Sequence, residues 1–460
     1  MKILLIYPNP KVEYDSLINH PRLASIMAII LKKLYNKLSS TGGYAIPPLG
    51  LLVIAANTPL EHEVFFVDER VEEIDFDMDI DLVGISVLTI SATRTYEISD
   101  RFRKRGIPVI LGGIHPSILP HEALEHANSV VIGEVEGIWE GIINDCKNHD
   151  LKSIYKAETF HSMENLPIPR FDLLKKGFYI SDNIIEIGRG CPFNCSFCSA
   201  SKFFGNRFRF RPIQDIVNEI KIRNLDNKFI LFISDNIFSD KEYAKKLFNA
   251  LLQLNIEWMS QSSILIAKNN ELLQLAARSG CKSLLIGFES LSIQNLKDIK
   301  KFHNSNPSDY HSLIKRIHDA GIGITGNFIV GLDEDQTSVF DGILKFVDET
   351  KIESPQIGIL IPYPGTEIFN YFEKNGRIIT KDWDKYYNIN SNVVFKPKQM
   401  TVNELKKGYC ETFLKLYSTL AIIKRLGFTR NFLSFYLPYN LGQNRKSIWL
   451  KKNVLQNLND

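Results

Sequence analysis

The sequence predicts an α/β protein that contains two parallel sheets, one after the other. We expect an N-terminal Rossmann-like domain of the flavodoxin type, a partial (β/α)6 barrel of the TIM type, and a C-terminal helical extension. Short apolar runs alternate with helical patterns along most of the 460 residues. These runs lack clean period-two alternation, which indicates strands buried on both faces of a parallel sheet. After about residue 375 the pattern becomes helical.

Residues 1–150 contain five of these apolar runs, which predict the strands of the first domain. They are KILLIYP (2–8), HEVFFVDE (62–69), DLVGISVLT (81–89), IPVILGG (107–113) and NSVVIGE (128–134). Amphipathic segments such as SATRTYEISDRFRKRG (91–106), which ends on a glycine, lie between them. The order of elements predicts a doubly wound domain. Residues 151–182 include NLPIPRFDLL, whose prolines predict an extended linker.

Residues 183–375 contain six further apolar runs, which predict the strands of the barrel. They are NIIEIGRG (183–190), KFILFISD (228–235), IEWMSQSS (256–263), CKSLLIGFES (281–290), GITGNFIVGL (323–332) and PQIGILIPYP (355–364). Six βα units indicate an open barrel, because a closed one has eight. In residues 376–460, the segment TVNELKKGYCETFLKLYSTLAIIKRLG predicts one or two long helices.

Composition limits the classes of protein that this chain can belong to. The net charge of +3 is too small to indicate nucleic-acid binding by itself. Six cysteines in 460 residues form no disulfide framework, which favours a reducing cytoplasm. The first residues, MKILLIYPNP, predict a buried strand rather than a signal peptide. No apolar window reaches the length of about 18 residues that a membrane-spanning helix needs; ASIMAIILKKL, from Ala24, is the nearest approach.

Three of the cysteines lie within eight residues, in the stretch GRGCPFNCSFCSA (188–200). Cys191, Cys195 and Cys198 follow the first predicted barrel strand directly and precede a helix. This position is at the C-terminal mouth of the barrel, where βα loops carry the chemistry. Three thiolates from one loop can hold three irons of a 4Fe–4S cube and leave the fourth iron open to a chelating ligand.

A structural zinc site and a chance clustering of structural cysteines remain open as alternatives to the iron–sulfur cube. Zinc would need a fourth ligand, usually from a second C-x2-C pair. The remaining three cysteines, Cys146, Cys281 and Cys410, lie in a predicted helix, strand and helix. We expect each of them to be a small buried apolar residue.

The spacing C-x3-C-x2-C, with Phe197 before the last cysteine, resembles that of radical S-adenosylmethionine (SAM) enzymes. The resemblance implies that SAM chelates the open iron through its amino and carboxylate groups. One electron from the reduced cluster, supplied by an external donor of the flavodoxin or ferredoxin type, then cleaves the sulfonium to a 5′-deoxyadenosyl radical. By the same resemblance, Phe197 packs near the adenine.

The resemblance also implies SAM contacts from the ends of three further barrel strands. These positions are Ser234, Asp235 and Asn236 after the second strand and Gln261 and Ser263 after the third. The first group is expected near the methionine amino group. Glu289, in GFES at the end of the fourth strand, is expected at the ribose hydroxyls, with a solvated strand-end acid as the alternative.

The first domain resembles the cobalamin-binding domain that precedes many radical SAM barrels. The matching residues are Ser86-Val87-Leu88 after one strand and Gly112-Gly113 after the next. A small hydroxyl and two glycines let the backbone approach a bulky nucleotide tail and corrin at the C-terminal ends of parallel strands.

Some elements of the cobalamin domain are absent or altered in this sequence. The D-x-H-x-x-G element, which supplies a cobalt ligand in many such domains, is missing. We expect His115, in GGIHPS, to be a turn or pocket residue rather than a cobalt ligand. TGGYAIPPLGLL (41–52) and GEVEGIWEG (133–141) resemble further family elements, although Val135 replaces the second glycine of the latter.

The segments RPIQDIVNEI and NVVFKPKQMTVNEL resemble the branch that contains hopanoid C-methylases. This resemblance implies methyl transfer from methylcobalamin to an unactivated carbon of a lipid-like or secondary-metabolite substrate. One alternative is a radical cyclisation or carbon–carbon bond formation on a lipid or tetrapyrrole, without methyl transfer. Another, from a different class of protein, is a non-catalytic iron–sulfur electron carrier.

Residues 415–460 are basic and rich in aromatic side chains, with Asp460 the only acidic one. Such a segment can lie on an anionic membrane surface, which would favour a lipid substrate. The alternative is a solvated face on helices that pack against the barrel. No added RNA-binding module is recognisable. We therefore expect a cytoplasmic enzyme of a small molecule or lipid, with peripheral membrane contact left open.

Overall fold

The computed structural model describes residues 1–10, 46–179, 181–301, 304, 306–387, 391–427 and 433–456. The segment ASIMAIILKKL and the first residues of TGGYAIPPLGLL lie outside the described residues, as do Phe428, Arg430, Phe432 and Asp460 of the basic C-terminal segment. The chain forms two compact units. The first comprises Met1–Asp182 together with Asp382–Tyr386, and the second comprises Asn183–Lys381 and Tyr387–Asp460.

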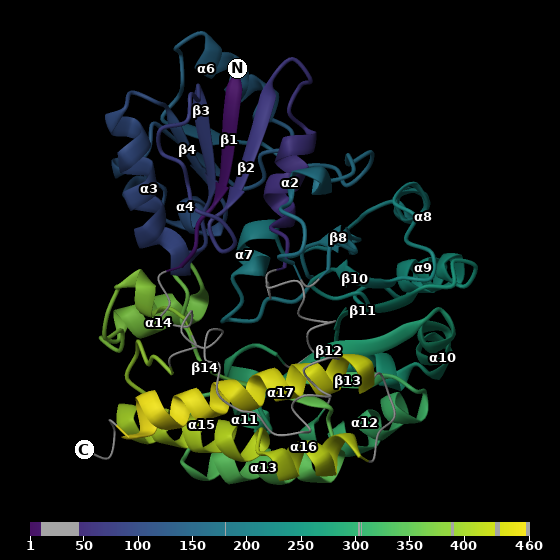
Figure 1. Cartoon of the computed structure of the whole chain (residues 1–460). Coiled ribbons are helices and arrows are strands. Elements are labelled where there is room, and N and C mark those ends of the chain that lie inside the picture. Colours follow the sequence, from purple (N-terminus) through teal and green to yellow (C-terminus); the bar gives the residue numbers. More distant parts are fainter. Residues whose placement is uncertain are drawn as a thin grey trace, which may run out of the picture. The chain divides into compact units, whose positions relative to one another are not determined.

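The first unit is built on a six-stranded sheet in which every pair of neighbouring strands is parallel. The strands are β1 (Lys2–Tyr7), β2 (Glu63–Asp68), β3 (Leu82–Ser86), β4 (Val109–Gly112), β5 (Ser129–Ile132) and β6 (Ile154–Lys156). Their order is β2-β1-β3-β4-β5-β6, which extends the flavodoxin-type order by one strand (Figure 1). The strand order reverses between β1 and β3, and ligands bind at the carboxyl ends of strands beside such a point.

Helices cover both faces of this sheet, as the buried apolar strands require. The helical segments are α2 (Leu49–Ala56), η2 (Thr89–Ser91), α3 (Ala92–Lys104), α4 (Ile114–Ile118), α5 (Pro120–Glu125), α6 (Trp139–Lys147), η3 (Phe171–Leu173) and η6 (Trp383–Lys385). One face packs Ile3, Leu5 and Ile110 against Leu52 of α2 and Ile143 of α6. The five predicted strands and the doubly wound topology are therefore confirmed.

The sequence did not predict strand β6 or the place of the segment Asp382–Tyr386. β6 lies inside the segment that we expected to be a linker, and its three residues are too few for an apolar pattern to show. Residues 151–182 are part of the first compact unit. Tyr179, for example, is buried and donates a hydrogen bond from its hydroxyl to Asp68 Oδ2, 3.1 Å away.

The second unit is built on six parallel strands that correspond to the six predicted runs. They are β7 (Ile184–Glu186), β10 (Phe229–Ile233), β11 (Glu257–Ser262), β12 (Cys281–Glu289), β13 (Gly323–Val330) and β14 (Ser354–Ile359). They pair in chain order from β7 to β14, and these two strands form the edges of the sheet. The partial barrel is thus confirmed. A short antiparallel pair, β8 (Gly188–Arg189) and β9 (Arg209–Phe210), flanks the loop that follows β7.

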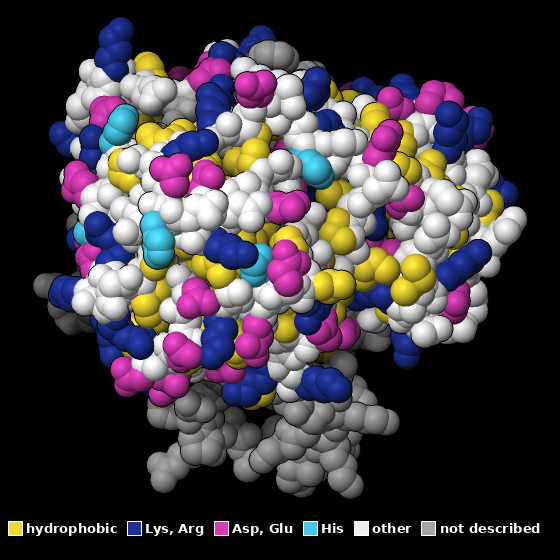
Figure 2. Space-filling model, turned by 90° about the horizontal axis from the view of Figure 1, so that it is seen from above, with side chains coloured by type: hydrophobic (Ala, Val, Ile, Leu, Met, Phe, Trp, Pro, Cys, Tyr) yellow, Lys and Arg dark blue, Asp and Glu magenta, His cyan; other side chains and the backbone are white. Residues whose placement is uncertain are grey.

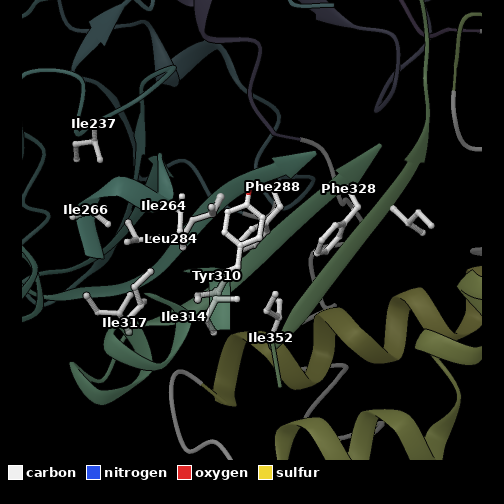
Figure 3. Close-up of a cluster of buried hydrophobic side chains, with 14 of the residues drawn as sticks. Ile237, Ile264, Ile266, Leu284, Phe288, Tyr310, Ile314, Ile317, Phe328 and Ile352 are labelled. Carbon is white, nitrogen blue, oxygen red and sulfur yellow. The ribbon is translucent and has the colours of Figure 1, made fainter. Parts of the chain in front are cut away.

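Amphipathic helices pack on the outer face of the barrel strands. The helical segments are α7 (Ala200–Phe204), α8 (Ile213–Ile222), α9 (Lys241–Leu251), η4 (Ile264–Lys268), α10 (Asn270–Arg278), α11 (Ile293–Asp298), η5 (Pro307–Asp309), α12 (Tyr310–Asp319), α13 (Ser338–Thr350) and α14 (Glu367–Lys374). Figure 3 shows this core, where the rings of Phe288 and Phe328 stack with centroids 5.4 Å apart and Tyr310 meets Phe288 edge-on. Side-chain caps such as Asp240, Asn269 and Thr366 fix where helices begin.

The C-terminal extension covers the end of the barrel at which its strands begin. It comprises α15 (Val402–Leu416), α16 (Thr419–Leu426), α17 (Leu433–Leu450) and a π-helical turn, η8 (Lys451–Leu455). Tyr436 of α17 is fully buried, fills the space above Gly323 and makes a 2.5 Å hydrogen bond with Ser283 Oγ. Phe435 stacks on Phe229, and Tyr439 hydrogen-bonds to Gln356. These aromatic side chains therefore pack against the amino-terminal ends of barrel strands.

Charged side chains of both signs are interspersed over the described part of the face shown in Figure 2. Among the described residues, none of the helices has the length and hydropathy needed to cross a bilayer.

Candidate functional site

The cysteine loop leaves the barrel between β8 and β9, at the carboxyl ends of the strands. Gly190 begins the loop with a φ of +85°, and a Cβ there would overlap the Arg207 carbonyl oxygen, so only glycine fits. Its N–H donates a 2.8 Å hydrogen bond to Asp235 Oδ2, from the loop after β10. Burial raises the pKa of Asp235. The carboxylate of this predicted SAM residue therefore anchors the start of the cysteine loop.

Two backbone hydrogen bonds at Ser196 hold the middle of the loop. Its N–H donates to the Ile299 carbonyl oxygen, and its carbonyl oxygen accepts from the N–H of Ile368, each at 3.0 Å. Asn194, in the same loop, donates to Glu367 Oε1 at 3.2 Å. The loop is thus fixed by the segment after α11 on one side and by the first turn of α14 on the other, which orders the thiols before any cluster binds.

The three cysteine thiols are close enough to interact electrostatically. Burial raises the pKa of Cys195 to about 12 and that of Cys191 to about 11, and the Cys198 thiol contributes to both shifts. Iron must therefore displace protons from these thiols when it binds. Among the described residues, no three His, Cys, Asp or Glu side chains converge on the position of a single metal ion. A cube takes one thiolate on each of three irons, which suits three thiols spread along one loop.

Lys301 places a buried positive charge beside these thiols. Its Nζ lies 2.6 Å from Glu289 Oε1, and the two side chains are only 12% and 10% exposed. Burial alone would lower the pKa of Lys301, but the Glu289 carboxylate and the thiols of Cys195 and Cys198 raise it above the usual lysine value. Gly287 makes room for the ion pair, because a Cβ there would overlap the Glu289 carboxylate. The cation can partly balance the negative charge of a thiolate-ligated cluster.

Glu289, predicted as the ribose contact, has an unusual backbone conformation. Its φ is +62°, in the left-handed region that residues with side chains seldom adopt. The Ser290 N–H turns back to the Phe288 carbonyl oxygen at 2.8 Å. This turn and the ion pair with Lys301 hold the Glu289 carboxylate on the inner face of the barrel, next to the cysteine loop.

The polar residues after β10 and β11 are brought together, and they use their side chains to shape the loops. Asn236 Oδ1 accepts hydrogen bonds from the N–H groups of Phe238 and Ser263, both at 3.2 Å. Ser234 Oγ accepts from Asn236 N, and Ser263 Oγ accepts from Leu265 N. A hollow of about 490 Å³ beside them is lined by Asn236 and Ser263, together with Phe193, Phe238, Lys241 and Lys268.

The remaining two predicted SAM residues lie at the same mouth. Gln261 is exposed at the end of β11, on the face opposite Trp258 and Ser262, and so points to the inner side of the barrel. Phe197 is partly buried and packs against the barrel core from within the cysteine loop. All seven predicted SAM residues are thus at the carboxyl ends of β10–β12 or in the cysteine loop itself.

In the first unit, the predicted cobalamin residues meet at the carboxyl ends of β3 and β4. Val87 N donates to the Gly112 carbonyl oxygen at 2.8 Å, so the two loops are directly bonded. Gly113 has a φ of +105°, and a Cβ there would lie 2.8 Å from the Val87 carbonyl oxygen. Ser86 and Leu88 are half-buried on either side of Val87. The two loops lie close together, and the glycines carry no side chains. A bulky ligand can therefore come close to their backbone.

His115 is fully buried behind these loops and hydrogen-bonded through both ring nitrogens. Nδ1 lies 3.3 Å from Thr89 Oγ1, and Nε2 lies 3.1 Å from the Tyr96 hydroxyl and 3.2 Å from Glu122 Oε1. This placement agrees with the prediction that His115 is a pocket residue. Cys146, Cys281 and Cys410 are buried in α6, β12 and α15, as predicted.

Sequence reasoning missed three residues that support the two sites: Lys301, Glu367 and Trp383. Lys301 reaches the cysteine loop from the segment after α11 and Glu367 from α14, and nothing in their local sequence marks them. Trp383 reaches the first unit from beyond the barrel. Only the buried tryptophan in an otherwise polar stretch, TKDWDKYY, was a signal that could have been noticed.

Sequence profiles of known domains match both units and define the class of protein. The profile of the Radical SAM superfamily matches residues 185–347, and that of the B12 binding domain matches residues 36–143. The same two-domain order occurs in a solved structure, the radical SAM methyltransferase TsrM from Kitasatospora setae with cobalamin and a [4Fe-4S] cluster bound. It is 14% identical, with a TM-score of 0.64, over 97% of this chain and 99% of that one. This class of enzyme binds a 4Fe–4S cluster, SAM and cobalamin.

Two characterised relatives identify the family within this class. Bacteriochlorophyllide d C-12(1)-methyltransferase from Chlorobaculum tepidum is 32% identical over 390 residues, which cover 82% of this chain and 84% of the relative. Hopanoid C-2 methylase from Rhodopseudomonas palustris is 25% identical over 394 residues, which cover 82% and 72% of the two chains. The chain therefore belongs to the cobalamin-dependent radical SAM methyltransferases.

Proposed function

We propose that this enzyme methylates an unactivated carbon of a large, apolar, ring-containing substrate, with a tetrapyrrole favoured over a polycyclic lipid. The observation that carries the proposal is the inner face of the barrel. Leu231, Ile233, Met259, Leu285 and Ile329 alternate with the helix-facing core residues of their strands and remain partly exposed. Gln261, Asn327 and Gln356 share this inner face, and its apolar part suits an apolar substrate. The higher identity to the bacteriochlorophyllide methyltransferase supports the order of preference.

When bound, the cluster with SAM supplies the radical that removes a hydrogen atom from the substrate, and cobalamin supplies the methyl group. The protein supplies position. Cys191, Cys195 and Cys198 hold the cluster, and Asp235 fixes the loop that carries them. The electron comes from an external donor of the flavodoxin or ferredoxin type.

Residues at the mouth of the barrel position SAM. We place Phe197 at the adenine and Glu289 at the ribose, with Lys301 orienting the Glu289 carboxylate. Ser234, Asn236 and Ser263 use their side chains to shape loops, so we assign the methionine end of SAM to the backbone of these loops and to Gln261. In the first unit, Ser86, Leu88, Gly112 and Gly113 seat the cobalamin.

Product stoichiometry in anaerobically reconstituted enzyme tests this function. With SAM carrying a deuterated methyl group, a bacteriochlorophyllide substrate and a one-electron reductant, methyl transfer gives labelled product with one S-adenosylhomocysteine and one 5′-deoxyadenosine each. Cyclisation would give 5′-deoxyadenosine without S-adenosylhomocysteine, and an electron carrier would give neither. If only a hopanoid substrate is methylated, the reaction stands and the preferred substrate class is wrong.

We also propose that this cytoplasmic enzyme contacts membranes through α16. Leu420 and Ile423, adjacent on this helix, are 64% and 62% exposed, and the neighbouring Lys415 and Lys424 are also exposed. Two exposed aliphatic side chains with flanking cations suit an anionic lipid surface.

Flotation with anionic liposomes tests this contact. The double substitution Leu420→Gln/Ile423→Gln should reduce the fraction of enzyme recovered with the liposomes. Leu60→Gln, at a 99% exposed leucine in the first unit, is the matched control. Equal recovery of all three proteins would exclude membrane contact through α16. Removing residues 415–460 would be a poorer test, because Tyr436 is part of the barrel core.

A further inference from the structure

Part of the first unit comes from far along the chain. The chain leaves the second unit after Lys381, contributes Asp382–Tyr386 to the first, and returns to the second at Tyr387. Trp383, in η6, is 8% exposed and Tyr386 is fully buried. Their rings meet edge-to-face with centroids 4.9 Å apart. A segment this short cannot form a core of its own, so its burial depends on the residues of the first unit that it contacts.

Trp383 contacts the region directly behind the predicted cobalamin loops. Its Nε1 donates a 2.8 Å hydrogen bond to Glu122 Oε1, in α5. Its ring meets the His115 ring edge-on, with centroids 5.4 Å apart and an interplanar angle of 71°. η6 also lies against η2, the turn that follows the Ser86-Val87-Leu88 motif. The segment η6 thus lies against elements that follow both β3 and β4, and its tryptophan contacts those that follow β4.

Glu122 is the centre of this cluster. Its Oε1 accepts from Trp383, from the Tyr96 hydroxyl at 2.9 Å and from His115 Nε2 at 3.2 Å. Although burial alone would raise the pKa of Glu122, the hydrogen bonds from His115 and Tyr96 hold it below the usual value. The carboxylate is therefore charged at neutral pH, and hydrogen bonds to a charged acceptor are the stronger kind.

The cluster is linked to the loops through His115 and Thr89. His115 N donates to the Val87 carbonyl oxygen at 3.2 Å, and Val87 N donates to Gly112. Thr89, which follows Leu88, contacts the other ring nitrogen of His115. A movement of His115 would therefore shift both loops. Trp383 packs against the His115 ring and so restrains this movement.

We propose that Trp383 is a positioning residue of the cobalamin site, which holds Glu122 and His115 so that the loops after β3 and β4 are preorganised for the corrinoid. The segment Asp382–Tyr386 then acts as a clasp from the C-terminal part of the chain. Preorganised loops bind more tightly because less ordering remains to be done on binding. His115 stays in this cluster when cobalamin binds and does not ligate the cobalt.

The substitution Trp383→Phe tests the proposal, since it keeps an aromatic ring but removes the N–H donor to Glu122. Titration of the cluster-loaded full-length protein with hydroxocobalamin, followed by absorbance, should show affinity about tenfold weaker, the scale of one hydrogen bond to a charged group. Iron and sulfide content should be unchanged. Trp449→Phe, in α17 of the second unit, is the matched control and should bind as the wild type does. Wild-type affinity in Trp383→Phe would overturn the proposal.

Hydrogen–deuterium exchange on the wild-type protein covers the case in which Trp383→Phe folds poorly. Hydroxocobalamin should protect residues 382–386 together with 86–91 and 112–118. Protection of the two loops without protection of 382–386 would overturn the clasp. In addition, the electron paramagnetic resonance spectrum of the reduced cob(II)alamin form should show no nitrogen superhyperfine splitting that depends on His115, apart from any caused by the cofactor's own benzimidazole; a splitting that disappears in His115→Gln would show that His115 ligates cobalt. Neither measurement depends on methyl transfer, so both remain informative if the proposed reaction is wrong.

Discussion

The two units carry their sites at the same place, the carboxyl edge of a six-stranded parallel sheet, but they assemble them differently. In the barrel, all three proposed cluster ligands come from one loop of eight residues. In the first unit, the proposed cobalamin site uses loops after two strands and the segment of residues 382–386. A site with contiguous ligands depends mainly on its own loop, whereas a site made of separate segments depends on how they are held together.

The largest expected effect is loss of the cluster. Cys195→Ser should abolish cluster-bound iron and the formation of 5′-deoxyadenosine, because two thiolates cannot replace three around the cube. Cobalamin affinity should be unchanged if the two sites are independent. Iron analysis and hydroxocobalamin titration measure the two properties. The control Cys146→Ala, at a buried cysteine of the first unit, should leave the iron content of the protein unchanged. Loss of cobalamin binding in Cys195→Ser would show that the sites are not separate.

The next effect concerns the charge beside the cluster. Lys301→Met should lower the rate of 5′-deoxyadenosine formation by about 10- to 100-fold, as is typical when a charged group beside metal ligands is lost. The reduction potential of the cluster should become more negative, because a nearby cation stabilises the added electron. Lys300→Met changes the neighbouring lysine, which is 46% exposed and paired with Glu367, and should have a small effect. Equal effects of the two substitutions would contradict the role of Lys301.

In the first unit, the contact between loops should be sensitive to one methyl group. Gly113→Ala should destabilise this unit by about 3 kcal/mol, because a positive φ is strained for alanine and the Cβ would crowd Val87. Gly106 also has a positive φ, but a Cβ there would have no neighbour within 4 Å. The substitution Gly106→Ala therefore measures the cost of backbone strain without the cost of a steric contact. Urea unfolding and cobalamin titration should show a greater loss for Gly113→Ala. Similar losses would mean that the loop contact is unimportant.

The smallest effect is a pH dependence confined to the second unit. Burial lowers the pKa of Lys446, in α17, to about 8. Between that value and the ordinary lysine pKa, the unfolded chain holds a proton that the folded chain has released, so stability rises with pH across this window. Lys446→Met removes the titration. The free energy of unfolding of Lys446→Met should exceed that of the wild type at pH 7, and this difference should shrink by about 2.5 kcal/mol at pH 10, measured by urea unfolding. A constant difference would contradict the lowered pKa.

The strands show how much of the fold could be predicted. All eleven apolar runs form strands in the expected places, because a strand buried on both faces needs a continuous apolar sequence. β6 was missed, since its three residues alternate between exposed and buried at the edge of the sheet. The helices of residues 376–460 were predicted, and packing against the barrel was one of two alternatives for residues 415–460. Which end of the barrel they cover was not predicted, because it depends on Tyr436 of α17 packing at the start of β13.

The predicted residues of the cofactor sites gather at two sheet edges, but several of their side chains bind other parts of the protein. Asp235 bonds to the cysteine loop, and Asn236 and Ser263 bond to backbone groups of neighbouring loops. Glu289 is paired with Lys301. A strand-end position predicts where a side chain lies, but its partners depend on which other loops reach the same edge.

The sequence by itself determined the two parallel sheets, their order along the chain and the trio of cysteines, because each rests on a local pattern of residues. The tertiary structure alone decided what surrounds them: the cation of Lys301 next to the thiols, Tyr436 at the amino-terminal end of the barrel strands, and Trp383 behind the loops that follow β3 and β4. These residues act across long separations along the chain. Their effect arises from burial and hydrogen bonding at one point in space, which no local pattern records.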